Sequence, residues 1–221
     1  MHINCQALGC MECCKHYWIS LFPSNAAQIA QSQGESLSQF LATHCLLDLQ
    51  LFPAKRQSGL SIPVSAFDPK TQVKISESFD SKPGFVLALP SVVLKRHENG
   101  ACEFLNQQNG LCQIYSSRPG QCRVFPFVSM DSKPLHELYP FCAFLENEKP
   151  TQNPFQAEQD AQLQATANYF DSVEQRGFES VWKHFPEKGI IRIGSKVIAQ
   201  ISQEEFLHVL SFIRKSEKNS A

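Results

Sequence analysis

Cysteine is the residue type whose number and spacing stand out in this chain. Nine cysteines occur among 221 residues, and four of them lie within the first fourteen positions. Thiolates that converge from tight turns can bind one metal ion, because zinc is commonly held by four cysteine or histidine side chains. The pattern therefore predicts metal coordination by eight candidate ligands: Cys5, Cys10, Cys13, Cys14, Cys102, Cys112, Cys122 and Cys142.

A disulfide framework is the main alternative to metal coordination, and two features argue against it. Disulfide-rich secreted domains are short and usually have an even number of cysteines, whereas this chain has 221 residues and nine cysteines. The first residues also lack the basic region and apolar core of a signal peptide. We therefore expect a cytoplasmic protein whose thiols stay reduced.

The first cysteine block contains a two-residue spacing that is typical of a metal knuckle. Cys10 and Cys13 are three positions apart, so both thiolates can bind one ion from the same turn. Cys14 is harder to place, because neighbouring side chains diverge. Either Cys13 and Cys14 face two different metal sites, or one site uses four of the eight cysteines and the others pack as small hydrophobic residues.

The second block suggests that a site draws on both parts of the chain. Cys102 and Cys112 have no close-spaced partner, while a two-residue knuckle supplies only half of a four-coordinate site. We therefore expect at least one site with ligands from both blocks. Cys142 follows an aromatic stretch and is also a candidate core residue. We predict that Cys45, on the apolar face of an expected helix, is dispensable for metal binding.

The metal itself is left open between zinc and iron, because thiolates suit both. The spacing Cys5-x4-Cys10-x2-Cys13 also matches the ligand run of plant-type ferredoxins, which keeps an iron–sulfur cluster among the candidates. His16 and His97 lie near cysteines in the sequence, but solvated or core positions suit them better. Arg118 and Arg123 are candidates to donate to ligand sulfurs or, equally, to anchor their turn.

Composition excludes several other classes of function. The formal net charge is −1 with acids and bases interspersed, which gives no electrostatic basis for binding nucleic acid or an anionic membrane. No apolar run approaches the length of a membrane span. The sequence contains no phosphate-binding glycine loop and no recognisable catalytic triad.

Local patterns predict helices and short strands in alternation. We expect helices over 24–33, 36–47 and 153–176 and from 202 onward, the last two with recognisable start signals. Short strands are expected over 72–76, 85–89, 92–94, 101–105 and 111–115, and a helical turn over 116–123. The part beyond the second block is expected to be mainly helical. Together these elements predict an α+β fold, in which flanking helices pack on a small antiparallel sheet that has metal-binding loops at one edge.

The domain organisation follows from where the cysteines lie. We expect a cysteine-cluster metal-binding domain over 1–150 and a helical C-terminal extension over 151–221 that packs on it. The C-terminal helices are a candidate surface for a protein partner, with no nucleic acid and no membrane involved.

The second block carries the most specific resemblance. Cys102-Glu-Phe-Leu, Gly110-Leu-Cys112-Gln-Ile-Tyr115 and Cys122-Arg-Val-Phe-Pro-Phe127, with the Cys10-x2-Cys13-Cys14 run, resemble the bacterial cysteine-cluster proteins with a zinc- or iron-chelating domain. Flagellin lysine-N-methylases carry a similar cluster. The resemblance implies metal binding but no settled reaction. The alternative function is that of a protein-modifying enzyme similar to flagellin lysine-N-methylase, with the cluster as its cofactor or support. Cys5 lies further from Cys10 than the family's usual spacing.

Overall fold

The computed structural model describes residues 8, 10–54, 59–128, 134–148, 153 and 155–218. These residues form an α+β fold with a mixed sheet of six strands, which confirms the predicted class. The chain divides into two compact units, each made of two segments. Unit 1 comprises Met1–Ser36 and Leu94–Asn168, and unit 2 comprises Leu37–Val93 and Tyr169–Ala221. The expected division into a metal-binding domain over 1–150 and a helical extension over 151–221 stays a prediction.

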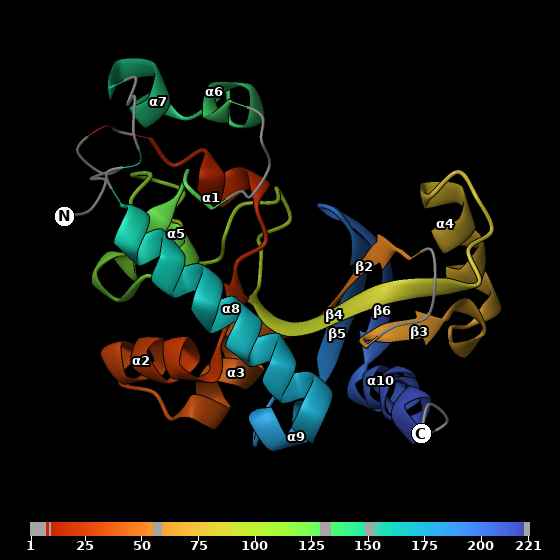
Figure 1. The fold of residues 1–221 in the computed structure, drawn as a ribbon. Helices are drawn as coiled ribbons and strands as arrows, with labels where there is room; N and C mark the ends of the chain where they lie inside the picture. Colours follow the sequence, from red (N-terminus) through yellow and green to blue (C-terminus); the bar gives the residue numbers. More distant parts are fainter. Residues whose placement is uncertain are drawn as a thin grey trace. The chain divides into compact units, whose positions relative to one another are not determined.

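Unit 2 contains nearly all of the regular sheet, in the order β4-β2-β5-β6 with β3 paired to β4 (Figure 1). Its strands are β2 (Cys45–Pro53), β3 (Ser61–Pro63), β4 (Phe85–Leu94), β5 (Lys188–Ile193) and β6 (Lys196–Ser202). Its helices are α3 (Leu37–His44), the 3-10 turn η1 (Val64–Ala66), α4 (Pro69–Ser78), α9 (Phe178–Val181) and α10 (Gln203–Lys218), besides the last residues of α8 (Gln156–Arg176). Helix α10 packs against β2, β3, β5 and β6, so it covers one face of the sheet.

The sheet is mixed, whereas the sequence predicted an antiparallel sheet. Strands β2 and β5 run parallel, with Leu49 opposite Ile191, whereas the β3–β4 and β5–β6 pairs are antiparallel. Strand β2 is buried along most of its length, as expected for a strand that other elements cover on both faces. Parallel pairing joins strands far apart in the sequence, so no local pattern indicates it.

Two predicted elements of unit 2 have a different structure. The expected helix over 36–47 ends at His44, and Cys45 and Leu47 lie in β2 instead. The expected strand over 72–76 lies inside helix α4. Asp68 caps that helix by accepting hydrogen bonds from the amides of Lys70 at 2.9 Å and Thr71 at 3.2 Å. An Asp-Pro start signal therefore outweighs the β-branched residues that follow.

The last third of the chain contains a hairpin that the sequence analysis missed. Strands β5 and β6 are joined by Gly194 and Ser195, and Gly194 has a φ of +59°. A two-residue connection with a positive φ is typical of antiparallel hairpins. The expectation of a mainly helical region was therefore wrong for 188–202, while α10 and its cap confirm the predicted last helix. Ser202 and Glu205 form the predicted capping box, with amide-to-side-chain distances of 2.8 and 3.2 Å.

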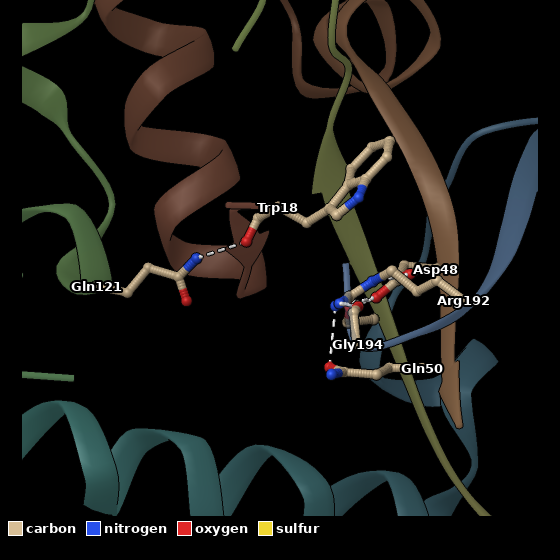
Figure 2. Close-up of polar contacts among 7 residues, drawn as sticks. Trp18, Asp48, Gln50, Gln121, Arg192 and Gly194 are labelled. Atoms are coloured by element: carbon tan, nitrogen blue, oxygen red, sulfur yellow. Dashed lines mark hydrogen bonds and ion pairs between the residues drawn. The ribbon is translucent and has the colours of Figure 1, made fainter. Parts of the chain in front are cut away.

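A buried ion pair crosses the parallel strands of unit 2 (Figure 2). The Asp48 side chain is fully buried and accepts from Arg192 Nε at 2.6 Å and from Nη2 at 2.9 Å. Arg192 also donates to the Gln50 side chain at 2.9 Å and to the Gly194 carbonyl at 2.7 Å. Ser91 donates to Asp48 at 3.2 Å. These bonds satisfy both charges, so the pair fixes the register of β2 against β5.

Unit 1 has little regular sheet and is built from short helices and turns. Its elements are α1 (Cys13–His16), β1 (Ser20–Leu21), α2 (Pro23–Gln33), the 3-10 turn η2 (Tyr115–Ser117), α5 (Gly120–Val124), α6 (Leu135–Leu138), α7 (Ala143–Glu148) and most of α8. Helix α2 begins at Pro23, one residue before the expected start at Ser24, and left-handed Gly34 ends it as predicted. Within the described residues of unit 1, no helix has the length and hydropathy of a membrane span, and the same holds for unit 2.

The predicted strands around Cys102 and Cys112 are not regular strands. Only isolated bridges occur there, Arg96 with Cys102 and Leu105 with Cys112. The backbone uses its hydrogen bonds in turns instead. The Asn106 side chain, for example, accepts from the amides of Gln108 at 2.9 Å and Asn109 at 3.3 Å. The cysteines among the described residues of unit 1 therefore lie in loops and in short helices.

Candidate metal centre

The two cysteine blocks meet through the backbone. Cys14 lies in α1, and its carbonyl accepts a hydrogen bond from the Cys102 amide at 2.7 Å. Arg96 also connects the two blocks, because its side chain donates to the carbonyls of Lys15 and Gly100. Its guanidinium lies 5.2 Å from the Trp18 ring centre. The sequence analysis missed Arg96, and nothing in its local pattern marks it. The first and second blocks thus form one structure within unit 1.

Turns in the second block bring its three cysteines toward the first. The Leu105 amide donates to the Cys102 carbonyl at 2.9 Å, and the Leu105 bridge to Cys112 then places these two cysteines on adjoining segments. Cys122 lies in α5, and its amide donates to the Pro119 carbonyl at 3.0 Å. The predicted helical turn over 116–123 is thus present as η2 and α5.

A cavity of about 150 Å³ lies where these segments meet. Most of its wall is apolar and includes Trp18, Ile19 and Leu94. Five cysteines also line it: Cys13, Cys14, Cys102, Cys112 and Cys122. Arg118 is the one cationic side chain in the lining. A largely apolar wall strengthens electrostatic interactions among the few polar groups that it encloses.

Arg118 is held rigidly beside these thiols. It is only 8% exposed, its guanidinium lies 3.7 Å from the Tyr115 ring centre, and its Nε donates to the Tyr115 carbonyl at 3.0 Å. Its charge helps to lower the pKa of Cys14, and it offsets part of the rise that burial causes in the pKa of Cys112 and Cys122. The bond to the Tyr115 carbonyl confirms that Arg118 anchors its turn, whereas donation from Arg118 to a ligand sulfur stays a prediction.

Four of the thiols interact electrostatically, and we call them the pocket group: Cys14, Cys102, Cys112 and Cys122. Burial raises the pKa of Cys102 to about 12, and burial also raises the pKa of Cys112 and, well above its usual value, that of Cys122. The charge of Cys14 raises all three pKa values further. Such coupling requires the four sulfurs to lie near one another.

Cys14 behaves in the opposite way from its partners. A hydrogen bond from the Cys13 side chain lowers the pKa of Cys14, and the charges of Arg118, Arg96 and Lys15 lower it further. The pocket group therefore combines one thiol that favours the thiolate with three that stay protonated in the absence of a metal. Metal binding at this group must displace their protons.

The other three cysteines among the described residues of unit 1 lie beside an aromatic cluster, and we call them the outer group, although Cys13 also lines the cavity: Cys10, Cys13 and Cys142. Cys10 Sγ lies 4.0 Å from the Phe141 carbonyl oxygen. Burial raises the pKa of Cys142, and the charge of Cys10 raises it further. Cys13 packs against the buried cluster of Phe125, Tyr139, Cys142 and Leu145.

Seven of the eight predicted ligands thus belong to the pocket group or to the outer group. The eighth, Cys5, lies outside the described residues. No disulfide joins any of the eight cysteines of the described residues. Cys45 is buried in β2 and belongs to unit 2, whereas both groups belong to unit 1. Within those residues, no three His, Cys, Asp or Glu side chains are already placed to hold a metal ion.

The two histidines near the cysteines have other contacts. His16 lies 3.7 Å from a Glu12 carboxylate oxygen, and its ring centre is 4.7 Å from that of Phe141. The His97 ring nitrogen lies 3.1 Å from the Glu103 carbonyl oxygen. Both arrangements agree with the expectation that these histidines serve the local structure.

Comparison with known proteins gives one match. Residues 4–143 match the model of the family CxxCxxCC, described as a putative zinc- or iron-chelating domain. No curated protein and no solved structure matches the chain. The family's name contains a run of four cysteines, of which this chain has Cys10, Cys13 and Cys14, with Ala7 at the remaining position. Because the match covers more than half of the sequence, the chain belongs to the CxxCxxCC family.

Proposed function

We propose that unit 1 binds a zinc or iron ion through the pocket group. The observation that carries this proposal is the hydrogen bond of 2.7 Å between the Cys102 amide and the Cys14 carbonyl, which joins the two blocks beside a cavity lined by all four thiols. This contact therefore already joins segments that carry ligands distant in the sequence. The family match supports the same chemistry.

The pocket group fits such an ion by type and by charge. Four thiolates satisfy the coordination preference of zinc, and they equally suit iron or an iron–sulfur cluster. A divalent ion with four thiolates has a net charge of −2. Arg118 and Arg96 supply two positive charges that act on Cys14. The site is therefore close to electrically neutral, which reduces the cost of placing it in an apolar wall.

Each side chain has a defined part in this proposal. Cys14 favours the thiolate and offers the first sulfur, while Cys102, Cys112 and Cys122 release protons as the loops close. The bound ion would supply a cross-link between the two blocks. Because protons are displaced, metal affinity is expected to rise with pH through the neutral range.

Metal counting on single variants tests the proposal. The chain is purified without oxygen and without chelator, and its zinc and iron contents are measured together with its visible absorption. We expect Cys102→Ser and Cys112→Ser to lose the ion of the pocket group. Cys45→Ser is the matched control, since it changes a buried thiol in unit 2 and should keep the metal.

Absorption separates the metals. Zinc leaves the protein colourless, whereas an iron–sulfur cluster gives a brown protein. Equal metal content in Cys102→Ser, Cys112→Ser and the control would refute coordination by the pocket group.

A further inference from the structure

We propose that Arg96, Trp18 and Gln121 are positioning residues for the ion of the pocket group, and we call these three side chains the frame. The role rests on the proposed function, because it needs an ion in the pocket group. It goes beyond that function, since it assigns part of the metal affinity and geometry to side chains that supply no sulfur.

Arg96 holds two ligand-bearing segments by their backbones. Its guanidinium donates to the carbonyl of Lys15, which follows Cys14 in the chain. It also donates to the carbonyl of Gly100, two residues before Cys102, and Arg96 itself forms a bridge with Cys102. A planar guanidinium that donates in two directions fixes how the two segments lie against each other, whereas a lysine has the charge without the fork of donors.

The turn that carries Gly100 has hydrogen bonds of its own. The Gly100 amide donates to the His97 carbonyl at 2.8 Å, and the His97 amide donates to the Ala101 carbonyl at 2.8 Å. Gly100 has a φ of +81°, a conformation that glycine adopts readily and other residues rarely do. Arg96 therefore binds a turn of defined shape, and that turn leads directly to Cys102.

Trp18 and Gln121 extend the frame to a third ligand-bearing segment. The Arg96 guanidinium lies 5.2 Å from the Trp18 ring centre, within the range of a cation–π contact. The Gln121 side chain donates to the Trp18 carbonyl at 3.5 Å (Figure 2). Gln121 precedes Cys122 in α5, and both Trp18 and Gln121 line the cavity. The frame thus contacts the segments that carry three of the four pocket-group thiols.

These contacts should reduce the entropy that metal binding loses. When an ion gathers ligands from flexible segments, the ordering of those segments lowers the affinity. The frame joins the segments of Cys14, Cys102 and Cys122 without using a sulfur, so part of that ordering occurs when the chain folds. The bound ion and the frame therefore stabilise the same junction.

Zinc competition with a coloured chelator, on the reduced full chain, tests the frame. Arg96→Lys keeps a positive charge beside Cys14 but not both carbonyl bonds, so its Kd for zinc should rise about 10–100-fold. Gln121→Ala removes one long hydrogen bond and should raise the Kd by a smaller factor. Arg176→Lys is the matched control, because it makes the same change at an exposed position of unit 2. It should keep the wild-type Kd.

Cobalt absorption separates positioning of the ligands from general support of the fold. Cobalt(II) held by thiolates absorbs visible light, and its bands depend on the arrangement of the sulfurs. At saturation, Arg96→Lys should show altered bands, while Arg176→Lys should match the wild type. A role in stability alone would lower the Tm of metal-free Arg96→Lys and leave the cobalt bands and the zinc Kd of the folded variant unchanged.

The outcomes separate this role from the proposed function. A wild-type zinc Kd in folded Arg96→Lys would overturn the frame and leave the pocket group standing. If that variant does not fold, Gln121→Ala decides instead, and a Kd equal to that of the control would overturn the frame. If Cys102→Ser binds zinc as tightly as the wild type, the proposed function itself fails.

Discussion

The two units of this chain are stabilised in different ways. Unit 2 contains a hydrogen-bonded sheet, an amphipathic helix over it and one fully satisfied ion pair. Unit 1 contains short helices and turns, and no disulfide joins the seven cysteines among its described residues. From this difference we expect apolar packing to suffice for unit 2 and the loops of unit 1 to depend on an ion bound by their sulfurs. The following predictions test that contrast.

Metal removal is expected to have the largest effect, and only in unit 1. Structural zinc contributes about 10–16 kcal/mol in small metal-dependent domains, so a strong chelator should lower the Tm by well over a few degrees. Hydrogen exchange should show that the amide of Cys102 loses protection, while the amides that join β2 to β5 keep it. An unchanged Tm after complete chelation would mean that metal does not stabilise the fold.

Breaking the buried ion pair should act on unit 2 alone. Asp48→Ala leaves Arg192 buried without its partner, which typically costs about 3–5 kcal/mol of unfolding free energy. Denaturant titration followed by the fluorescence of Trp182, a buried residue of unit 2, measures this loss. Metal content should not change in the folded variant. The double variant Asp48→Leu with Arg192→Met is the control, and it should recover most of the stability.

Removing the buried arginine of unit 1 should weaken metal binding more than it weakens the fold. Groups around a metal's ligands typically change affinity about 10–100-fold, so Arg118→Gln should raise the Kd for zinc by that factor. Competition with a coloured chelator measures the change. Arg123→Gln is the matched control from the same helical turn, because Arg123 is not among the residues that line the cavity. Equal affinities of the two variants would assign Arg118 to local structure only.

Cys45 should give the smallest effect and serve as the reference for all cysteine variants. Cys45→Ala removes one buried sulfur from β2 and should destabilise unit 2 by about 1 kcal/mol. Metal stoichiometry and Kd should equal those of the wild type. A lost equivalent of metal in this variant would break the separation of roles between the units.

Elements with local start and stop signals could be predicted from the sequence. Gly34 ends α2, and the reciprocal Ser202–Glu205 cap starts α10, because these signals act within one helical turn. The parallel pairing of β2 with β5 could not be predicted, since its partners lie in distant segments. The hairpin at Gly194 had a readable signal, a short glycine turn between alternating residues, that the analysis overlooked.

The candidate ligands could be recognised from their spacing, but their grouping could not. The spacing of Cys10 and Cys13 suggests one shared ion, but it does not reveal that Cys10 approaches Cys142 or that Cys13 packs against the cluster that contains Cys142. Which thiols meet depends on contacts between distant segments, such as the bond from the Cys102 amide to the Cys14 carbonyl. The contacts of Arg96 could not be predicted either, because its partners are the backbone carbonyls of Lys15 and Gly100.

The most direct test of the account is X-ray absorption at the metal edge. It is best measured on a chain that carries Cys10→Ser and Cys142→Ser, so that Cys13 is the one sulfur of the outer group that remains. We expect a first shell of four sulfurs at about 2.3 Å, the zinc–thiolate distance, or its iron equivalent. A first shell dominated by nitrogen or oxygen, or one with only two sulfurs, would contradict a site that Cys14, Cys102, Cys112 and Cys122 complete together.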